Sequence, residues 1–452
     1  MEQILDFSKN GFLKHVFVWI VAGLGIGYLA TSFAGASAGE YDPALVNAGD
    51  TAWMLVSAAL VMIMTPAVGF FYGGMVSVKN VVSVLKQSVV ILALVSVQWV
   101  LLGYSLAFGP DVGGMIGNLS FFGLRGVGFA PDPNYATSIP ALVFMMFQAM
   151  FAIVTPALII GAFVGRIRFK TLVLFTLLWT TLVYDPVAHW VWAPGGWLRT
   201  LGALDFAGGT VVHMSAGFSA LAAALLVGKR LNAASPAENA NNVPFVILGA
   251  ALLWFGWFGF NAGSALAAGA LAASAFVVTN TAAAAAALTW IGLSWAQNRK
   301  ISAMAGAIGA VCGLVVITPA SGFVGPVAAL AIGVLGGVAT YLAVYWRSTK
   351  IRIDDTLDVW AAHGIGGLTG AILTGFFAEK AINAAGNDGF LFGNAHQLLV
   401  QAEAVLAVAL YSFAATWIIL KILSFVMPLR VTSSEEERGL DLSVHGEAGY
   451  RF

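Results

Sequence analysis

Two short segments of the chain each carry one carboxylate and one imidazole, inside or beside a long apolar run. The first is Gly202-Ala-Leu-Asp-Phe-Ala-Gly-Gly-Thr-Val-Val-His213, and the second is Asp358-Val-Trp-Ala-Ala-His363-Gly-Ile-Gly-Gly. An ionisable side chain at membrane depth costs about 3 kcal/mol to insert, so by default it marks a pathway or a binding site. A single buried histidine is more often a core residue, but two such segments 150 residues apart favour a functional pair.

The chemistry open to such a pair follows from the imidazole ring. A neutral imidazole offers one donor and one acceptor, so His213 and His363 in contact can relay a proton or bind a small polar solute inside an apolar pore. A metal site is the less favoured alternative, because a third ligand and HExxH-type spacing are missing, and we expect no metal and no cofactor. Asp205 lies eight residues before His213, where a carboxylate can cap the free N–H groups at a helix start.

The composition predicts a protein embedded in a lipid bilayer. The chain is 60% hydrophobic and only 9% charged, whereas soluble domains contain about 25% charged residues. The formal net charge of zero gives no reason to expect nucleic-acid binding. The single cysteine, Cys312, excludes an intrachain disulfide. An enzyme is the least favoured class, because no nucleophile–base pair or cofactor-binding loop stands out.

Apolar runs of about 20 residues predict an all-α membrane protein with eleven transmembrane helices. The expected spans are 50–74, 82–108, 138–164, 171–192, 205–228, 244–264, 270–296, 302–319, 323–345, 358–377 and 398–427. Lys and Arg concentrate in alternate loops, which predicts an N-terminus outside and a C-terminus in the cytoplasm. The histidine-bearing spans are fifth and tenth, which favours a five-plus-five inverted repeat plus one extra helix, with the site near the midplane.

The two ends of the chain are expected to lie outside this transmembrane domain of residues 39–430. Basic residues, an apolar run and then Ala36-Ser37-Ala38 predict a signal peptide over residues 1–38, with an uncleaved first helix as the alternative. Residues 431–452 are polar and charged, so they cannot insert in the bilayer and need another surface for order.

Aromatic residues gather toward the expected outer side. One run, Trp254-Phe-Gly-Trp257-Phe-Gly-Phe260-Asn-Ala-Gly-Ser264, ends the sixth span, and Met146-Phe-Gln148-Ala-Met-Phe151 lies in the third. Such stripes are usually core or membrane-interface residues. Here Trp192, Phe151 and Ser264 all fall on the outer side, where ring faces and a hydroxyl can hold a small cation.

Four ordered motifs resemble those of a known family. The runs GALDFAGGTVVH, WFGFNAGSA, TPASGFVGP and DVWAAHGIGG are similar to those of the ammonium transporter (Amt/Rh) family, on its bacterial and archaeal ammonium transporter branch. The resemblance covers the chain from about Asp50 to the tail. It implies a transporter that binds ammonium or methylammonium outside, removes a proton and conducts ammonia inward.

The resemblance also implies roles for individual residues. Those expected at an external ammonium-binding vestibule, and at a stacked phenyl gate below it, are Trp192, Phe151, Ser264 and Phe260. Those expected in the pore are the twin histidines His213 and His363, the lining residue Trp257, and Asp205, which is implicated in ammonium recognition and deprotonation.

The family's assembly and regulation are implied in the same way. We expect a homotrimer in the inner (plasma) membrane, with one pore in each subunit and a cytoplasmic regulatory tail. A trimeric PII-type signal protein is the expected cytoplasmic partner. The alternatives are an ammonium sensor with little flux and a neutral gas channel of the Rhesus type.

The chain departs from the family pattern at two places. After Trp192 it reads Ala-Pro-Gly-Gly-Trp, one residue longer than the common turn, which leaves Trp190 and Trp197 as alternative wall residues of the vestibule. Gly165 stands where the family often has glutamate before its basic loop, so a cytoplasmic contact is expected to differ.

Overall fold

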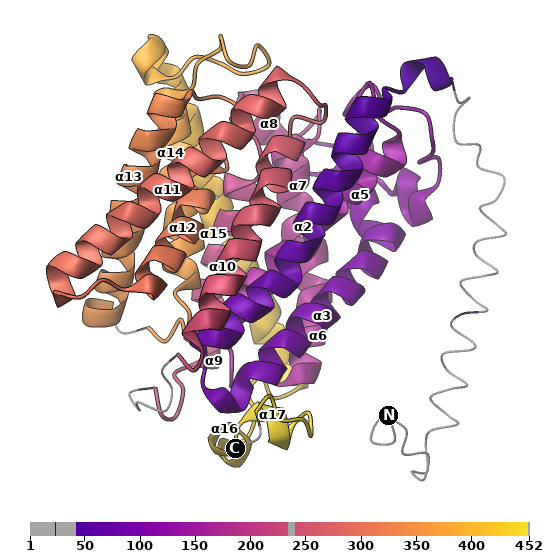
Figure 1. Cartoon of the computed structure of the whole chain (residues 1–452). Helices are drawn as coiled ribbons and strands as arrows, with labels where there is room; N and C mark the ends of the chain where they lie inside the picture. Colours follow the sequence, from indigo (N-terminus) through magenta and orange to yellow (C-terminus); the bar gives the residue numbers. More distant parts are fainter. Residues whose placement is uncertain (1–22, 24–41, 234–239, 352, 451–452) are drawn as a thin grey trace.

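The computed structural model describes residues 23, 42–233, 240–351 and 353–450. The expected signal peptide, residues 1–38, lies outside the described residues apart from Gly23. Within them the chain is a bundle of long helices with shorter helices at both ends and one antiparallel hairpin (Figure 1).

The helices are mostly separated by short loops or by π-helical turns. The α-helices are α2 (Ala48–Met75), α3 (Val81–Gln98), α4 (Tyr104–Phe108), α5 (Ala141–Ile159), α6 (Phe169–Trp179), α7 (Asp185–Trp192), α8 (Trp197–Leu201), α9 (Ser215–Val227), α10 (Val243–Trp257), α11 (Ala270–Asn298), α12 (Ala303–Ile317), α13 (Pro326–Trp346), α14 (Gly366–Phe377), α15 (Ala395–Val426), α16 (Ser433–Arg438) and α17 (Leu440–Ser443). The 3-10 and π-helical segments are η1 (Pro43–Leu45), η2 (Val78–Asn80), η3 (Trp99–Gly103), η4 (Leu119–Leu124), η5 (Ile160–Ala162), η6 (Thr180–Tyr184), η7 (Gly209–Met214), η9 (Phe258–Ala262), η10 (Arg347–Ile351), η11 (Trp360–Ile365) and η12 (Phe390–Phe392). The hairpin strands are β1 (Asp111–Val112) and β2 (Ile116–Gly117).

The described residues form nine helices that are long and apolar enough to span a membrane. Of the eleven expected spans, 302–319 is the shorter apolar helix α12 and 358–377 is η11 continued by α14, and neither is among the nine. The outer surface of the bundle is apolar, with Val327, Leu399 and Phe425 exposed by 80%, 67% and 79%. Such a surface suits hydrocarbon rather than water, so the multi-pass membrane class is confirmed.

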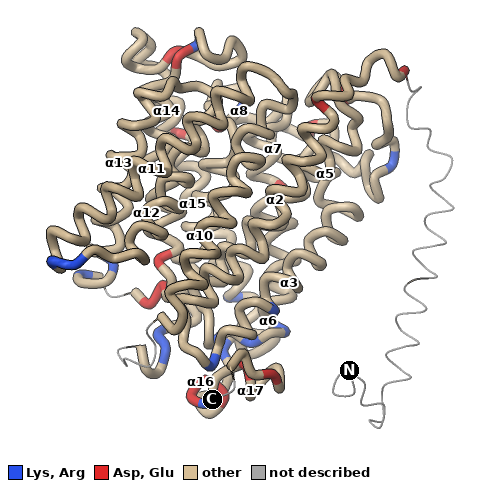
Figure 2. The backbone as a smooth tube through the Cα atoms, in the orientation of Figure 1, with Lys and Arg blue, Asp and Glu red and all other residues tan. Residues whose placement is uncertain are grey.

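The charges are concentrated at the two ends of the bundle. In Figure 2 most Lys and Arg lie at the end that also carries α16 and α17. We call this the tail end, and the opposite end, which carries α8, the outer end (Figure 1). The long apolar middle of the bundle contains few charged residues, as the composition predicts.

Helices α9 and η11 cross in direct backbone contact. A Cβ atom added at Gly217 would lie 2.1 Å from the Gly364 nitrogen and 2.3 Å from its Cα. Small residues at such crossings let membrane helices approach closely. This crossing brings together the two segments that carry His213 and His363, both of which lie in π-helical turns, η7 and η11. Turns of this kind are frequent at functional sites.

The tail is docked on the chain's own loops. Both carboxylate oxygens of Asp441 accept backbone N–H groups at the start of α3, from Ser83 at 2.7 Å and Val82 at 3.0 Å. Glu436 pairs with Arg430 at 2.7 Å and accepts the Leu231 N–H at 2.8 Å. The tail, which the sequence predicts to need another surface for order, is therefore docked on loops of the same chain.

The Gly217 crossing leads to a stability prediction. Gly217→Ala places a methyl group into the backbone of Gly364, and overpacking of this kind costs about 1–3 kcal/mol or more. Gly292→Ala is the matched control, because no atom lies within 4 Å of an added Cβ there. We expect a lower midpoint of thermal unfolding in detergent for the Gly217 variant only. Equal midpoints in the two variants would contradict the crossing.

The Asp441 contact leads to a second prediction. Asp441→Ala removes the cap of α3, which is worth about 0.5–2 kcal/mol, and should release residues 431–450. Limited proteolysis is then expected to cleave the tail faster than in the native chain. Glu437→Ala is the control, because it alters an exposed acidic residue of α16. In this variant the tail should be cleaved at the native rate. Unchanged protection of the Asp441 variant would argue against docking through this carboxylate.

Candidate functional site

A cavity of about 160 Å³ lies near the outer end of the bundle. Phe151 on α5, Trp192 at the end of α7, and Ser264 after η9 line it together. The Phe151 and Trp192 rings meet edge to face, with centroids 5.7 Å apart and planes at 83°. The Trp192 indole N–H donates to the Asp205 carbonyl at 3.0 Å, which orients the ring. The structure thus gathers the three predicted vestibule residues around one space, which we call the outer cavity.

Two hydrogen-bond acceptors face this aromatic wall. The Ser264 hydroxyl donates to the Phe260 carbonyl at 2.9 Å, which leaves its oxygen lone pairs free to accept. Gln148 also lines the cavity, and its buried Oε1 has no hydrogen-bond partner among the described residues. The sequence analysis assigned Gln148 no role, although it is the only polar residue between Ala141 and Val154.

The alternative tryptophans lie elsewhere. Trp190 donates its indole N–H to the Met115 carbonyl at 2.7 Å, and its ring packs on Tyr411 and Trp197 at centroid distances of 4.6 and 5.8 Å. Neither Trp190 nor Trp197 lines the outer cavity. The extra residue after Trp192 therefore leaves Trp192 as the tryptophan in the cavity wall.

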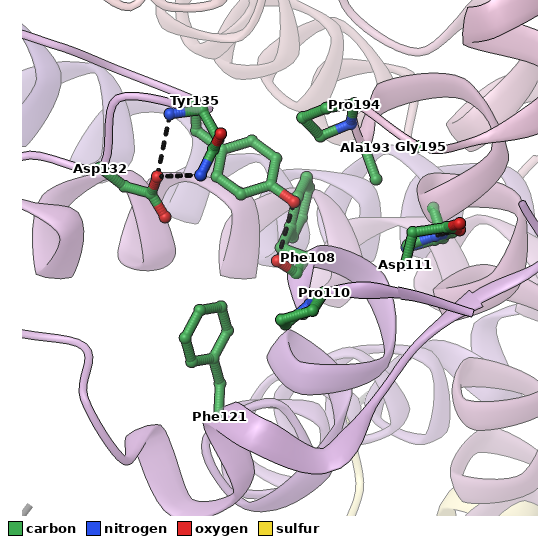
Figure 3. A pocket seen from close by; sticks show the side chains of 12 residues that line it. Phe108, Pro110, Asp111, Phe121, Asp132, Tyr135, Ala193, Pro194 and Gly195 are labelled. Carbon is green, nitrogen blue, oxygen red and sulfur yellow. Dashed lines mark hydrogen bonds and ion pairs between the residues drawn. The ribbon is translucent and has the colours of Figure 1, made fainter.

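A second cavity of about 280 Å³ adjoins the first (Figure 3). The two share the wall residues Phe108, Asn134 and Tyr135, and Figure 3 shows the Tyr135 hydroxyl bonded to the Phe108 carbonyl between Asp132 and Asp111. We call this space the acidic cavity.

A third buried histidine, His189, is among the residues that line the acidic cavity. Its Nε2 lies 2.8 Å from Asp111 Oδ1 and its Nδ1 lies 2.9 Å from the Ala107 carbonyl. The hydrogen bond from His189 holds the pKa of Asp111 below its usual value. The contact ties α7 to β1, and the sequence analysis did not identify it, because the two residues are 78 positions apart.

Below the outer cavity two phenyl rings close the path. The Phe151 and Phe260 centroids are 4.3 Å apart, and the rings are tilted by 42° rather than stacked in parallel. The His213 ring lies nearly parallel to Phe260, at 5.9 Å and 19°, and to Trp257, at 5.4 Å and 27°. The rings thus form one aromatic column that leads from the outer cavity to the first histidine.

The two histidines His213 and His363 are in contact. The Nδ1 atoms of His213 and His363 lie 3.3 Å apart, and the ring centroids are 5.3 Å apart. Both rings line a narrow cavity of about 20 Å³, together with Trp257, Phe260 and aliphatic side chains. A cavity of about 10–15 Å³ on this measure holds one water. The space therefore fits one molecule of about that size between apolar walls.

Thr318 determines which nitrogens of the pair carry protons. Its hydroxyl donates to the Leu314 carbonyl at 2.7 Å, so its oxygen can only accept from its other partners. Those partners are Trp257 Nε1 at 2.9 Å and His213 Nε2 at 3.3 Å. His213 therefore carries its proton on Nε2, and its Nδ1 accepts from the Nδ1–H of His363. A neutral His363 is then left with Nε2 as a free acceptor.

The carboxylate of Asp205 caps the start of η7. Its carboxylate accepts the N–H groups of Gly208, Gly209 and Thr210 at 2.8, 2.7 and 2.7 Å, and also the Thr210 hydroxyl. It is 7% exposed and does not line the outer cavity. The geometry matches the capping interpretation, and its own carbonyl holds the Trp192 indole.

In the second histidine-bearing segment, the carboxylate that caps the helix is Asp355 and not the expected Asp358. Asp355 accepts the Trp360 N–H at 2.7 Å at the start of η11, and it lies eight residues before His363, as Asp205 does before His213. Asp358 instead pairs with Arg347 at 2.5 Å and has a left-handed backbone with φ of 58°. The expectation that Asp358 mirrors Asp205 is wrong, because its carboxylate is paired with Arg347 and only its backbone carbonyl accepts an N–H group of the helix, that of Ala362 at 2.8 Å.

An inner cavity of about 260 Å³ follows the narrow one toward the tail end. The two cavities share His363, Phe71, Tyr72 and Val311. Asp358, which pairs with Arg347, also lines the inner cavity. Outer, narrow and inner cavities thus form a series that two phenyl rings and two imidazoles interrupt.

Comparison with known proteins agrees with this geometry. The model of the Ammonium Transporter Family matches residues 52–450. An ammonium transporter of Bacillus subtilis (strain 168) is 49% identical over 403 residues, which cover 89% of this chain and 98% of that protein. The crystal structure of Saccharomyces cerevisiae Mep2 superposes with a TM-score of 0.81 at 37% identity, over 87% of this chain and 92% of that one. A structure described as a sensor Amt protein has a TM-score of 0.81 at 32% identity, over 88% and 98%.

The match spans nearly all of the described chain, and the relatives are covered almost end to end. It includes the segments that carry the aromatic column, the paired imidazoles and the tail. The chain therefore belongs to the Ammonium Transporter Family.

Proposed function

We propose that the protein transports ammonium, which binds in the outer cavity, loses a proton and crosses the pore as ammonia. One observation carries this proposal: in a member of this family, two phenyl rings separate a cation-suited cavity from a solute-sized apolar cavity that is lined by two contacting imidazoles. Whether the proton follows by a separate route decides whether transport is electrogenic.

The outer cavity suits a small cation with N–H donors. The faces of Trp192 and Phe151 can attract a positive charge, which is worth about 0.5–2 kcal/mol for each cation–π contact. The Ser264 oxygen and the partnerless Gln148 Oε1 can accept N–H bonds. Ammonium and methylammonium carry both a positive charge and N–H donors. A hydrated metal ion has no N–H donors and no weakly hydrated surface that could pack on the rings.

The phenyl pair selects against charge. An ion passing Phe151 and Phe260 would have to leave its hydration shell in a space with no counter-charge, which costs several kcal/mol. Ammonia carries no charge and loses only hydrogen bonds. Beyond the rings the free acceptor of His363 can receive an N–H group, so the imidazoles replace part of the lost hydration.

Asp205 supports this site from behind. We assign it to holding η7 and the Trp192 indole in place, since its carboxylate already accepts several donors. In this assignment it aids ammonium recognition by orienting the cavity wall, and proton removal passes to water or to another group.

The membrane arrangement is part of the same proposal. We propose eleven spans in a five-plus-five inverted arrangement plus one helix, with the outer end facing outward and the tail in the cytoplasm of a plasma membrane. The concentration of Lys and Arg at the tail end supports this orientation. We also propose a homotrimer with one pore in each subunit, and a PII-type signal protein as the partner at the tail end.

Transport is preferred to sensing. The ammonium transporter of Bacillus subtilis is more similar in sequence than the sensor Amt protein, at 49% against 32%. Current recording on a solid-supported membrane tests the choice, with proteoliposomes given an ammonium pulse. A sustained ammonium-dependent current or methylammonium uptake supports transport, and binding without either would support a sensor.

The paired imidazoles predict a loss of function without unfolding. His213→Ala or His363→Ala should lower ammonium transport by about tenfold or more, or let other solutes pass, because each removes a link of the polar path. Uptake of labelled methylammonium and the ammonium-evoked current are the measurements. His396→Ala, at an exposed position on α15, is the control and should transport normally. Full and equally selective transport in both pore variants would refute their assignment.

The outer cavity predicts a change in affinity. Trp192→Leu combined with Ser264→Ala should raise the half-saturation concentration by about several-fold to tens-fold, from the loss of roughly 0.5–2 kcal/mol of cation–π attraction plus one acceptor. Trp295→Leu changes a tryptophan that is exposed on α11 and should leave half-saturation unchanged. If the double variant keeps the native half-saturation, ammonium binds elsewhere.

A further inference from the structure

A guanidinium lines the cavity that we assign to a cation. Arg199, on the short helix α8, belongs to the wall of the outer cavity together with Trp192, Phe151 and Ser264. One of its terminal nitrogens, Nη1, donates to the Trp192 carbonyl. This bond holds the positive group beside the tryptophan whose ring face is proposed to attract ammonium.

Nothing in the described part of the chain neutralises this charge. No carboxylate lies within 4.0 Å of the Arg199 nitrogens among the residues that the structure describes. The carboxylates of the adjoining acidic cavity form no ion pair with Arg199 and are hydrogen-bonded to other groups, Asp111 to His189 and Asp132 to Asn134. The outer cavity therefore combines cation-attracting ring faces with one unpaired positive charge.

The charge acts on the wall that the outer and acidic cavities share. Tyr135 belongs to both cavities, and burial together with Asp132 raises the pKa of its hydroxyl, whereas Arg199 opposes that rise. Because Arg199 and Tyr135 both line the outer cavity, a cation bound there would lie within the electric field of the guanidinium.

We propose that Arg199 sets the ammonium affinity of the outer cavity, as a positive charge that weakens retention of the cation and favours its neutral form. The inference rests on the proposed function, because it takes ammonium to be the cation that binds beside Trp192. It assigns Arg199 a specificity-determining role, separate from that of the residues that attract the ion.

The physical reason is a balance between capture and release. A pathway conducts only when its site binds well enough to fill and weakly enough to empty. A like charge nearby also disfavours the protonated form of a titratable group. Arg199 therefore opposes the attraction of Trp192 and Phe151, and it favours ammonia at the entrance to the phenyl pair.

The test compares three variants in proteoliposomes at low ionic strength, by the half-saturation concentration for ammonium and for methylammonium. Arg199→Gln removes the charge and should lower half-saturation by about threefold to tenfold, the range for a partly screened unit charge. Arg199→Lys keeps the charge and should stay near the native value. Lys380→Gln removes a positive charge that lines neither the outer nor the acidic cavity, and should change nothing.

The outcomes separate this inference from the proposed function. An unchanged or raised half-saturation in Arg199→Gln, in a chain that still transports, overturns the inference and leaves ammonium transport standing. A rise in both Arg199→Gln and Arg199→Lys would show that the bond to Trp192 matters and the charge does not. If the Gln variant does not fold, Arg199→Ala is measured in its place against the same expectation. Absence of transport in the native chain would instead refute the proposed function.

Discussion

At Gly217 the backbone of α9 lies against the backbone of Gly364, with no room for a side chain between them. The two π-helical turns beside this crossing project His213 and His363 toward each other until their Nδ1 atoms are 3.3 Å apart. The narrow cavity, the proton positions set by Thr318, and the aromatic column above all depend on this approach. A larger residue at the crossing would push the two backbones apart, and the imidazole rings beside the crossing would separate with them.

Most buried polar groups in the bundle are satisfied, as the absence of water in a bilayer requires. Asp205 and Asp355 each accept backbone N–H groups at the start of a histidine-bearing segment. Several buried side-chain atoms in the described part of the chain have no partner, and one of them, the amide oxygen of Gln148, lines the outer cavity. A buried acceptor without a partner is costly, so a ligand with N–H donors would complete it there.

At the tail end, hydrogen bonds connect the docked tail to the ends of the helices that carry the paired histidines. The backbone of Val431 donates to the Arg166 carbonyl at 3.0 Å. The buried Arg166 side chain in turn donates to the carbonyls of Gly228, which follows α9, and Asp354, which precedes η11. Burial lowers the pKa of this guanidinium to about 10. One side chain thus joins the residue after α9 to the loop before η11, and the docked tail is hydrogen-bonded to the backbone of the same residue.

The sequence by itself determined the membrane class, the positions of the long helices, the histidine pair and the aromatic residues of the outer cavity. These follow from apolar run length and from ionisable residues in apolar runs, which are properties local to a segment. Only the tertiary structure decided that Asp355 caps η11 while Asp358 pairs with Arg347, because spacing alone does not show which of two nearby carboxylates lies beside the guanidinium. It also decided that Thr318 orients His213 from 105 residues away, and that Arg199 lines the outer cavity. Such contacts join helices distant in sequence, so no spacing within one segment could reveal them.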